Sequence, residues 1–138
     1  MSSRTFVGEL SCIALARLFV RQTLEAESRS EACDLAVLLT SELATNVVRH
    51  AGTSFEVVVS ASHEVIRVEI HDGAAVTEAF CDFVEHPPLS VEATSIGGRG
   101  IMLMSRTALR FGLLDRGPEG KAVWFELPVA ESTDGVEP

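Results

Sequence analysis

The chain has 138 residues, of which 46% are hydrophobic, and its formal net charge at pH 7 is −9. This length predicts one domain with its own core. The acidic balance argues against sequence-independent nucleic-acid binding, and no apolar run is long enough to span a bilayer. The N-terminus has no signal-peptide pattern, so we expect a cytoplasmic protein. We expect a single domain over residues 1–130 and a disordered polar tail over residues 131–138.

The first predicted elements are a short strand at residues 5–10 and a helix over residues 11–27. The helical segment contains neither Gly nor Pro. Arg17 and Arg21 lie one turn apart on this helix. They indicate either a solvated face or a contact surface for an acidic partner.

A second helix is predicted from Ser30 to Ala51, because Ser28 or Ser30 can cap its start and Gly52 can end it. At about 100° per residue, one arc of its helical wheel is apolar and holds Leu35, Leu38, Leu39 and Leu43. The opposite side is expected to hold Asp34, Thr40, Ser41 and Thr45.

Two polar residues of this helix, Glu42 and Asn46, fall within the apolar arc and lie one turn apart. A carboxylate and an amide that point inward cost free energy unless they meet partners or line a wet cleft. The spacing alone leaves two interpretations open, a buried hydrogen-bonded pair and a binding site.

The middle of the chain predicts an antiparallel hairpin and then a long irregular segment. Residues 54–61 are β-rich, and residues 65–71 alternate between apolar and polar side chains. Residues 74–96 contain Pro87-Pro88 and are too long for a simple turn, so we expect a functional lid with a short helix near residues 77–85.

The last third predicts a helix over residues 100–109 and strands over residues 110–115 and 121–128. Trp124 and Phe125 are expected in the core. The predicted order of elements favours an α+β fold, a two-layer sandwich of helices on one face of a mostly antiparallel sheet.

Cysteines and histidines give no sign of a metal centre. The three cysteines, Cys12, Cys33 and Cys81, have no C-x-x-C spacing and are expected to be reduced, mostly buried thiols. The four histidines are scattered without a ligand pattern, and we expect no structural zinc.

Three segments together resemble the N, G1 and G2 boxes of the GHKL ATPase superfamily, whose domains have the Bergerat fold. They are Glu42-x-x-x-Asn46, Asp72-Gly73 and residues 97–100, Gly-Gly-Arg-Gly. The resemblance covers about residues 10–128. Within the superfamily, the chain is similar to a group of short single-domain proteins, the anti-sigma-factor serine/threonine kinases of bacterial partner-switching systems.

This resemblance implies that Glu42 is the general base and that Asn46 holds Mg²⁺ against the phosphates of ATP. An amide oxygen suits that ion, which binds few protein oxygens and keeps phosphate and water ligands. A carboxylate one turn away could accept the proton of an attacking hydroxyl. Arg49 follows on the flank of the same face and is expected to reach a phosphate.

The other two segments are expected to bind the rest of the nucleotide. Gly98 and Gly100 let backbone N–H groups approach an anion at a helix N-terminus, and Arg99 could add a charged contact to a phosphate. In the resembling family the carboxylate at the position of Asp72, followed here by Gly73, accepts a hydrogen bond from the amino group of adenine. Plain glycine and Asp-Gly turns are the structural alternatives.

Two departures from the family pattern affect the adenine side of the site. The usual D-x-G-x-G is replaced by Asp72-Gly73-Ala74-Ala75, and Ala122 replaces a threonine whose hydroxyl helps to bind adenine in relatives. Nucleotide affinity could therefore be weakened or lost.

Three hypotheses follow. The preferred one is an ATP- and Mg²⁺-dependent serine/threonine kinase that phosphorylates an anti-sigma-factor antagonist of the STAS type and sequesters a sigma factor. The second is a non-catalytic, nucleotide-gated protein-binding module, and the third is an interaction domain without ATP. The resemblance also implies a homodimer.

Overall fold

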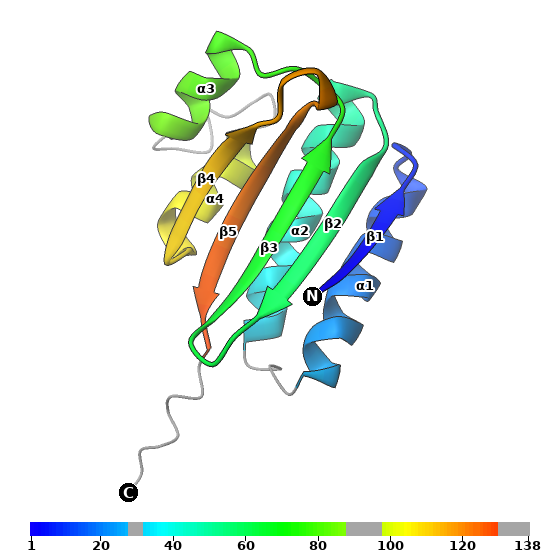
Figure 1. Ribbon diagram of the computed structural model, residues 1–138, viewed down its shortest axis with the longest axis vertical. Helices are drawn as coiled ribbons and strands as arrows, with labels where there is room; N and C mark the ends of the chain where they lie inside the picture. The colour runs from blue at the N-terminus through cyan, green and yellow to red at the C-terminus, as the bar shows by residue number, and fades with distance from the viewer. Residues whose placement is uncertain (28–31, 88–97, 130–138) are drawn as a thin grey trace, which may run out of the picture.

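A computed structural model describes residues 1–27, 32–87 and 98–129 of the chain. Within these ranges, five strands form one sheet in the order β1-β2-β3-β5-β4, and all neighbouring strands in it are antiparallel. Helices α1, α2 and α4 cover one face of this sheet (Figure 1). The predicted α+β two-layer architecture is therefore confirmed. Among the described residues, the model contains no helix with the length and apolar character needed to cross a membrane.

The elements follow the predicted order along the chain. They are β1 (Ser2–Phe6), α1 (Ser11–Ala26), α2 (Cys33–Asn46), a π-helical turn η2 (Val47–Ala51), β2 (Phe55–Ala61), β3 (Val65–Asp72), α3 (Glu78–Glu85), α4 (Gly98–Thr107), β4 (Arg110–Asp115), a 3₁₀ turn η4 (Gly117–Glu119) and β5 (Lys121–Pro128).

Most boundaries match the prediction, with two shifts. The first strand occupies residues 2–6 and pairs with β2, so it lies earlier than expected. Helix α4 begins at Gly98, two residues before the predicted start. The proposed serine caps of the second helix, the end of the predicted lid and the tail at 131–138 lie outside the described residues.

Alternation along the central strands separates a buried face from an open one. On β3, Ile66, Val68 and Ile70 are buried beneath the helices, and the same side continues to Asp72. On β5 the corresponding side chains are Val123, Phe125 and Leu127. A polar residue at the next alternate position therefore lies on the same buried face, either in the core or at a site within it.

Trp124 lies on the open face of the sheet, so its predicted core position is wrong, whereas Phe125 is fully buried as predicted. The guanidinium of Arg67 lies 4.0 Å from the Trp124 ring centroid and bonds Glu69 and Glu126 at 2.8 and 3.0 Å. The hydrogen bond from Arg110 lowers the pKa of Glu126, and the bond from Arg67 adds to this effect.

The buried arc of α2 differs from the predicted one. Leu38 is exposed, whereas Thr40, expected on the outward side, is fully buried. The physical reason is that α2 packs against α1 as well as against β3 and α4. Because α2 is covered by α1 on one side and by the sheet and α4 on another, its buried arc is wider than predicted and includes Ala36 and Ala44.

Thr40 offers a stability test, because its buried hydroxyl has no hydrogen-bond partner among the described residues. Thr40→Val keeps the shape and removes the unpaired polar group, so we expect the free energy of unfolding to rise by about 1 kcal/mol in urea denaturation. Thr45→Val is the matched control, since the Thr45 hydroxyl donates to the Ser41 carbonyl at 2.7 Å. Equal effects in the two variants would contradict this explanation.

The two arginines of α1 point toward α2. Arg17 donates to the Ser41 hydroxyl and Arg21 to the Asp34 carboxylate, both at 3.2 Å. These contacts join the two helices, so the acidic-partner surface stays a prediction.

All three cysteines are free thiols. Only Cys33 is buried, and burial raises the pKa of its thiol, whereas Cys12 and Cys81 are partly exposed. The expectation of mostly buried cysteines therefore holds for one residue of the three.

Candidate functional site

A cavity of about 310 Å³ lies between the end of α2, the sheet, α3 and the start of α4. Its volume is at the lower end of the range for small-molecule sites, roughly 300–1,000 Å³. Most of its wall is apolar, with side chains that include Leu43, Ile70, Phe80, Phe83, Ile101 and Val123. The polar side chains on the wall are Asn46, His50, Asp72, Thr77 and Lys121.

The π-helical turn η2 shapes one wall of this cavity. It follows Asn46 directly and closes with a hydrogen bond from Gly52 N–H to the Val47 carbonyl at 2.9 Å, after which Gly52 takes the left-handed conformation with φ 69°. Because a π turn is wider than an α turn, Asn46, His50 and Ala51 all reach the cavity. Such insertions are frequent at functional sites.

Asn46 is the polar side chain that α2 itself contributes to the cavity. Its side chain is half-buried, and no group in the described ranges hydrogen-bonds it. The alternative of a buried Glu42–Asn46 pair satisfied by neighbours therefore has no support from these contacts. The amide is left available for a ligand.

Glu42 lies outside the cavity wall and forms an ion pair with Arg99. Arg99 donates through Nε and Nη2 to the two carboxylate oxygens, at 3.0 and 2.7 Å. These bonds raise the pKa of Arg99. The Arg99 side chain is 59% exposed and that of Glu42 is 17% exposed. In this state both oxygens of the expected base are occupied, and the expected phosphate ligand is the group that occupies them.

The glycines at the start of α4 permit close helix packing. A Cβ at Gly100 would lie 3.0 Å from the Cβ of Glu42, tighter than almost any ordinary contact. Gly100 therefore lets the N-terminus of α4 approach α2 beside Glu42. Gly98 is the first residue of α4, and Gly97 lies outside the described residues. Binding of phosphates by this helix start stays a prediction.

Asp72 and Lys121 form an ion pair within the cavity wall. They are directly opposite each other in the β3–β5 ladder, and Lys121 Nζ lies 3.0 Å from Asp72 Oδ1. Each residue is only 7% exposed. The Ala74 backbone N–H donates to the same oxygen at 2.8 Å, so Oδ2 accepts from neither of these donors.

Gly120 makes this pairing possible. Its φ is 113°, and a Cβ at this position would collide with the Asp72 carbonyl oxygen. Only glycine allows the start of β5 to pass so close to the end of β3. The Gly-Lys dipeptide thus holds Lys121 beside Asp72.

Lys121 is the site residue that sequence reasoning missed. The pattern of the resembling family points to position 122, but Ala122 does not line the cavity and Lys121 does. Two signals could have identified it. Lys121 is the only lysine in the chain, and it continues the period-two series Val123, Phe125, Leu127 on the buried face of the last strand.

Two other expected ligands lie away from the cavity. Arg49 is exposed and absent from the cavity wall, so its contact with a phosphate stays a prediction. Gly73 is also exposed, and its N–H donates to the Thr53 hydroxyl at 3.0 Å. His50, in contrast, is an exposed residue of the cavity wall.

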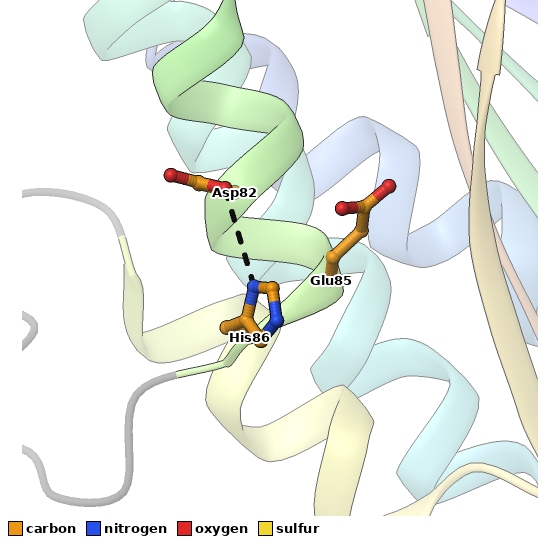
Figure 2. Close-up of side chains that lie close together, drawn as sticks. All are labelled: Asp82, Glu85 and His86. Carbon is orange, nitrogen blue, oxygen red and sulfur yellow. Dashed lines mark ion pairs between the residues drawn. The ribbon is translucent and has the colours of Figure 1, made fainter.

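Helix α3, near the position predicted for a short helix, closes part of the cavity. Thr77 caps it by accepting a bond from the Phe80 N–H at 3.1 Å. At the end of α3, Asp82, Glu85 and the following residue His86 bring three possible metal-ligand atoms within 4.8 Å of one another (Figure 2). Asp82 and His86 have i,i+4 spacing, a signal that sequence reasoning missed. All three residues are exposed, as such groups often are without a metal, and we assign no ion to them.

The residues present fit Mg·ATP. The apolar wall suits a flat base, Asp72 offers an acceptor at its edge, and Asn46 offers an amide that no described residue bonds. An amide oxygen is a suitable ligand for Mg²⁺ that also binds phosphates.

Comparison with known proteins agrees with this arrangement. A family model described as a histidine kinase-like ATPase domain matches residues 6–127. That range contains every residue of the cavity wall. A comparison with curated proteins found no significant match.

Proposed function

Because this chain belongs to the histidine kinase-like ATPase family, we propose that it is an ATP-dependent serine/threonine kinase that acts on an anti-sigma-factor antagonist and sequesters a sigma factor. At the coarser level, the chain is an ATP-binding, kinase-like ATPase domain. The serine/threonine specificity, the STAS-type antagonist, the sigma factor and a homodimer are parts of the proposal.

One observation carries the assignment of roles. Asn46 lines the cavity with no hydrogen-bond partner among the described residues, while Glu42, one turn earlier, lies beside the glycine-rich start of α4. A nucleotide whose base lies against Asp72 would extend its phosphates toward this end of α2. The metal ligand Asn46 and the general base Glu42 would then lie at the phosphates, where phosphoryl transfer requires them.

In the proposed reaction, Glu42 accepts the proton of the acceptor hydroxyl. The hydroxyl oxygen forms a bond to the γ-phosphorus, the bond from this phosphorus to the β–γ bridging oxygen breaks, and ADP leaves. Asn46 would hold Mg²⁺, which when bound neutralises charge on the phosphates. Asp72 positions the base of the nucleotide.

We further propose that Arg99 exchanges its partner on nucleotide binding. Its contact with Glu42 engages both carboxylate oxygens, and we expect Glu42 to serve as the base once Arg99 has moved to a phosphate. Because the Arg99 side chain is 59% exposed, solvent screens its ion pair with Glu42, and such a pair contributes about 0–1 kcal/mol, so this release costs little. A phosphate offers Arg99 an equally suitable acceptor.

Arg99→Gln tests this role. We expect Mg·ATP affinity to fall about tenfold, the loss of one charge-assisted contact, while the free energy of unfolding changes by less than about 1 kcal/mol. Titration calorimetry and urea denaturation measure the two quantities. Arg110→Gln is the control, because Arg110 pairs with Glu126 on the open face of the sheet. Unchanged affinity in Arg99→Gln would contradict the exchange.

The kinase proposal itself is tested by incubating the protein with Mg·[γ-³²P]ATP and a STAS-type antagonist from the same genome. The expected product is the antagonist phosphorylated on serine or threonine. A stable complex without any phosphate transfer would contradict kinase activity. That outcome would favour a second candidate, a nucleotide-gated binding module, which the Glu42–Arg99 contact also supports because it engages the carboxylate of the expected base.

A further inference from the structure

The Asp72–Lys121 pair has a feature that the proposed function does not use. A carboxylate that accepts from the amino group of adenine needs no buried cation beside it. Yet the single lysine of the chain lies there, 7% exposed, and its charge is held in the cavity wall. Burial of a lysine is uncommon unless it is paired or has a ligand.

The geometry leaves part of the Lys121 ammonium available to a ligand. One Nζ–H donates to Asp72 Oδ1 at 3.0 Å, and Nζ lies 5.0 Å from the ring centroid of Phe80 on α3. An ammonium has three donors, so others remain for a group in the cavity. Asp72 Oδ2 is likewise available as an acceptor. The wall thus presents a donor and an acceptor side by side.

This combination matches both kinds of purine edge. Adenine presents an amino donor next to a ring-nitrogen acceptor, and a 6-oxopurine presents a carbonyl acceptor next to a ring N–H donor. A lone carboxylate repels the carbonyl oxygen and so rejects the 6-oxopurine. An ammonium beside the carboxylate gives that oxygen a charged donor, while the ring N–H can bond the carboxylate.

We propose that Lys121 is a specificity-determining residue that lets this site bind 6-oxopurine nucleotides as well as ATP. This inference rests on the proposed function, and it extends the nucleotides that the site binds from ATP to 6-oxopurine nucleotides. The β3–β5 register and Gly120 fix the lysine beside Asp72, so the donor is built into the sheet.

The test is calorimetric titration of Mg·ATP and Mg·ITP, because inosine differs from adenosine only in this edge of the base. The wild type is expected to bind ITP within about tenfold of ATP. Lys121→Met keeps the length of the side chain and removes the donor, so the ratio of the ITP to the ATP dissociation constant should rise at least about tenfold. Lys121→Arg keeps a cationic donor and should leave the ratio near the wild-type value.

Each outcome decides the matter. A wild type that binds ATP but rejects ITP by more than about tenfold overturns the inference and leaves the proposed function intact. A smaller rise of the ratio in a folded Lys121→Met also overturns it. If that variant does not fold, the wild-type ratio and Lys121→Arg decide. A folded wild type that binds neither nucleotide overturns the proposed function and this inference with it.

Discussion

Replacing Glu42 with glutamine is expected to reduce phosphate transfer to the protein acceptor by about 10²- to 10⁴-fold, the usual contribution of a general base. Glutamine has nearly the same shape but cannot accept the proton of the attacking hydroxyl. Mg·ATP affinity should stay within about threefold, because Glu42 lies outside the cavity wall. Single-turnover transfer and titration calorimetry measure the two effects.

The control for this variant comes from its ion-pair partner. Glu42→Gln also breaks the contact with Arg99, so Arg99→Gln removes the same contact from the other side and leaves the carboxylate free. We expect Arg99→Gln to transfer phosphate at saturating ATP and Glu42→Gln not to do so. Equal rates in Glu42→Gln and the wild type would remove Glu42 from the catalytic role.

Asp72→Asn is expected to lower the free energy of unfolding by about 3 kcal/mol and to abolish measurable binding of Mg·ATP. The loss of stability arises because the Lys121 charge stays buried without its counter-charge. Breaking a buried pair from one side costs about 3–5 kcal/mol, and a position in a cavity wall favours the lower value. The loss of binding is expected because asparagine has one acceptor oxygen in place of two, and the Ala74 N–H and Lys121 already donate to one oxygen of Asp72. Urea denaturation and calorimetry measure the two effects.

The double variant Asp72→Asn/Lys121→Met separates stability from binding. Replacing both partners of a buried ion pair is often nearly neutral, so most of the lost stability should return. Binding should not return, because asparagine still offers one acceptor oxygen where the carboxylate offered two, and the Ala74 N–H donates at this position. Recovery of ATP binding in the double variant would show that Asp72 does not contact the base.

The sequence predicted the fold because local patterns and packing agree in most elements. Alternation in residues 65–71 and the turn around Gly117-Pro118 define strands whose observed ends differ little from the predicted ones. The helical spacing in residues 11–27 likewise matches α1. The helical wheel predicted the wrong burial for Leu38 and Thr40, because α2 contacts a second helix as well as the sheet and is buried over a wider arc than one apolar face.

For the candidate site, the sequence indicated individual residues and missed their contacts. Glu42, Asn46, Asp72 and Arg99 follow from motif spacing, which is local. That Arg99 bonds Glu42, and that Lys121 pairs with Asp72, depends on approaches across 57 and 49 positions of the chain. No local period reports such contacts. Strand alternation alone could have placed Lys121 on the buried face, but only the β3–β5 register gives its partner.

The central claim, a nucleotide site in which Asn46 holds the metal, is tested most directly by titrating Mg·ATP into the wild type and into Asn46→Ala. We predict binding to the wild type, none detectable to Asn46→Ala, and equal melting temperatures, since no described group bonds the amide. Thr45→Ala is the control on the same helix, outside the cavity wall, and should bind as the wild type does. Equal affinity in Asn46→Ala and the wild type, or a folded wild type that binds no Mg·ATP, would contradict the claim.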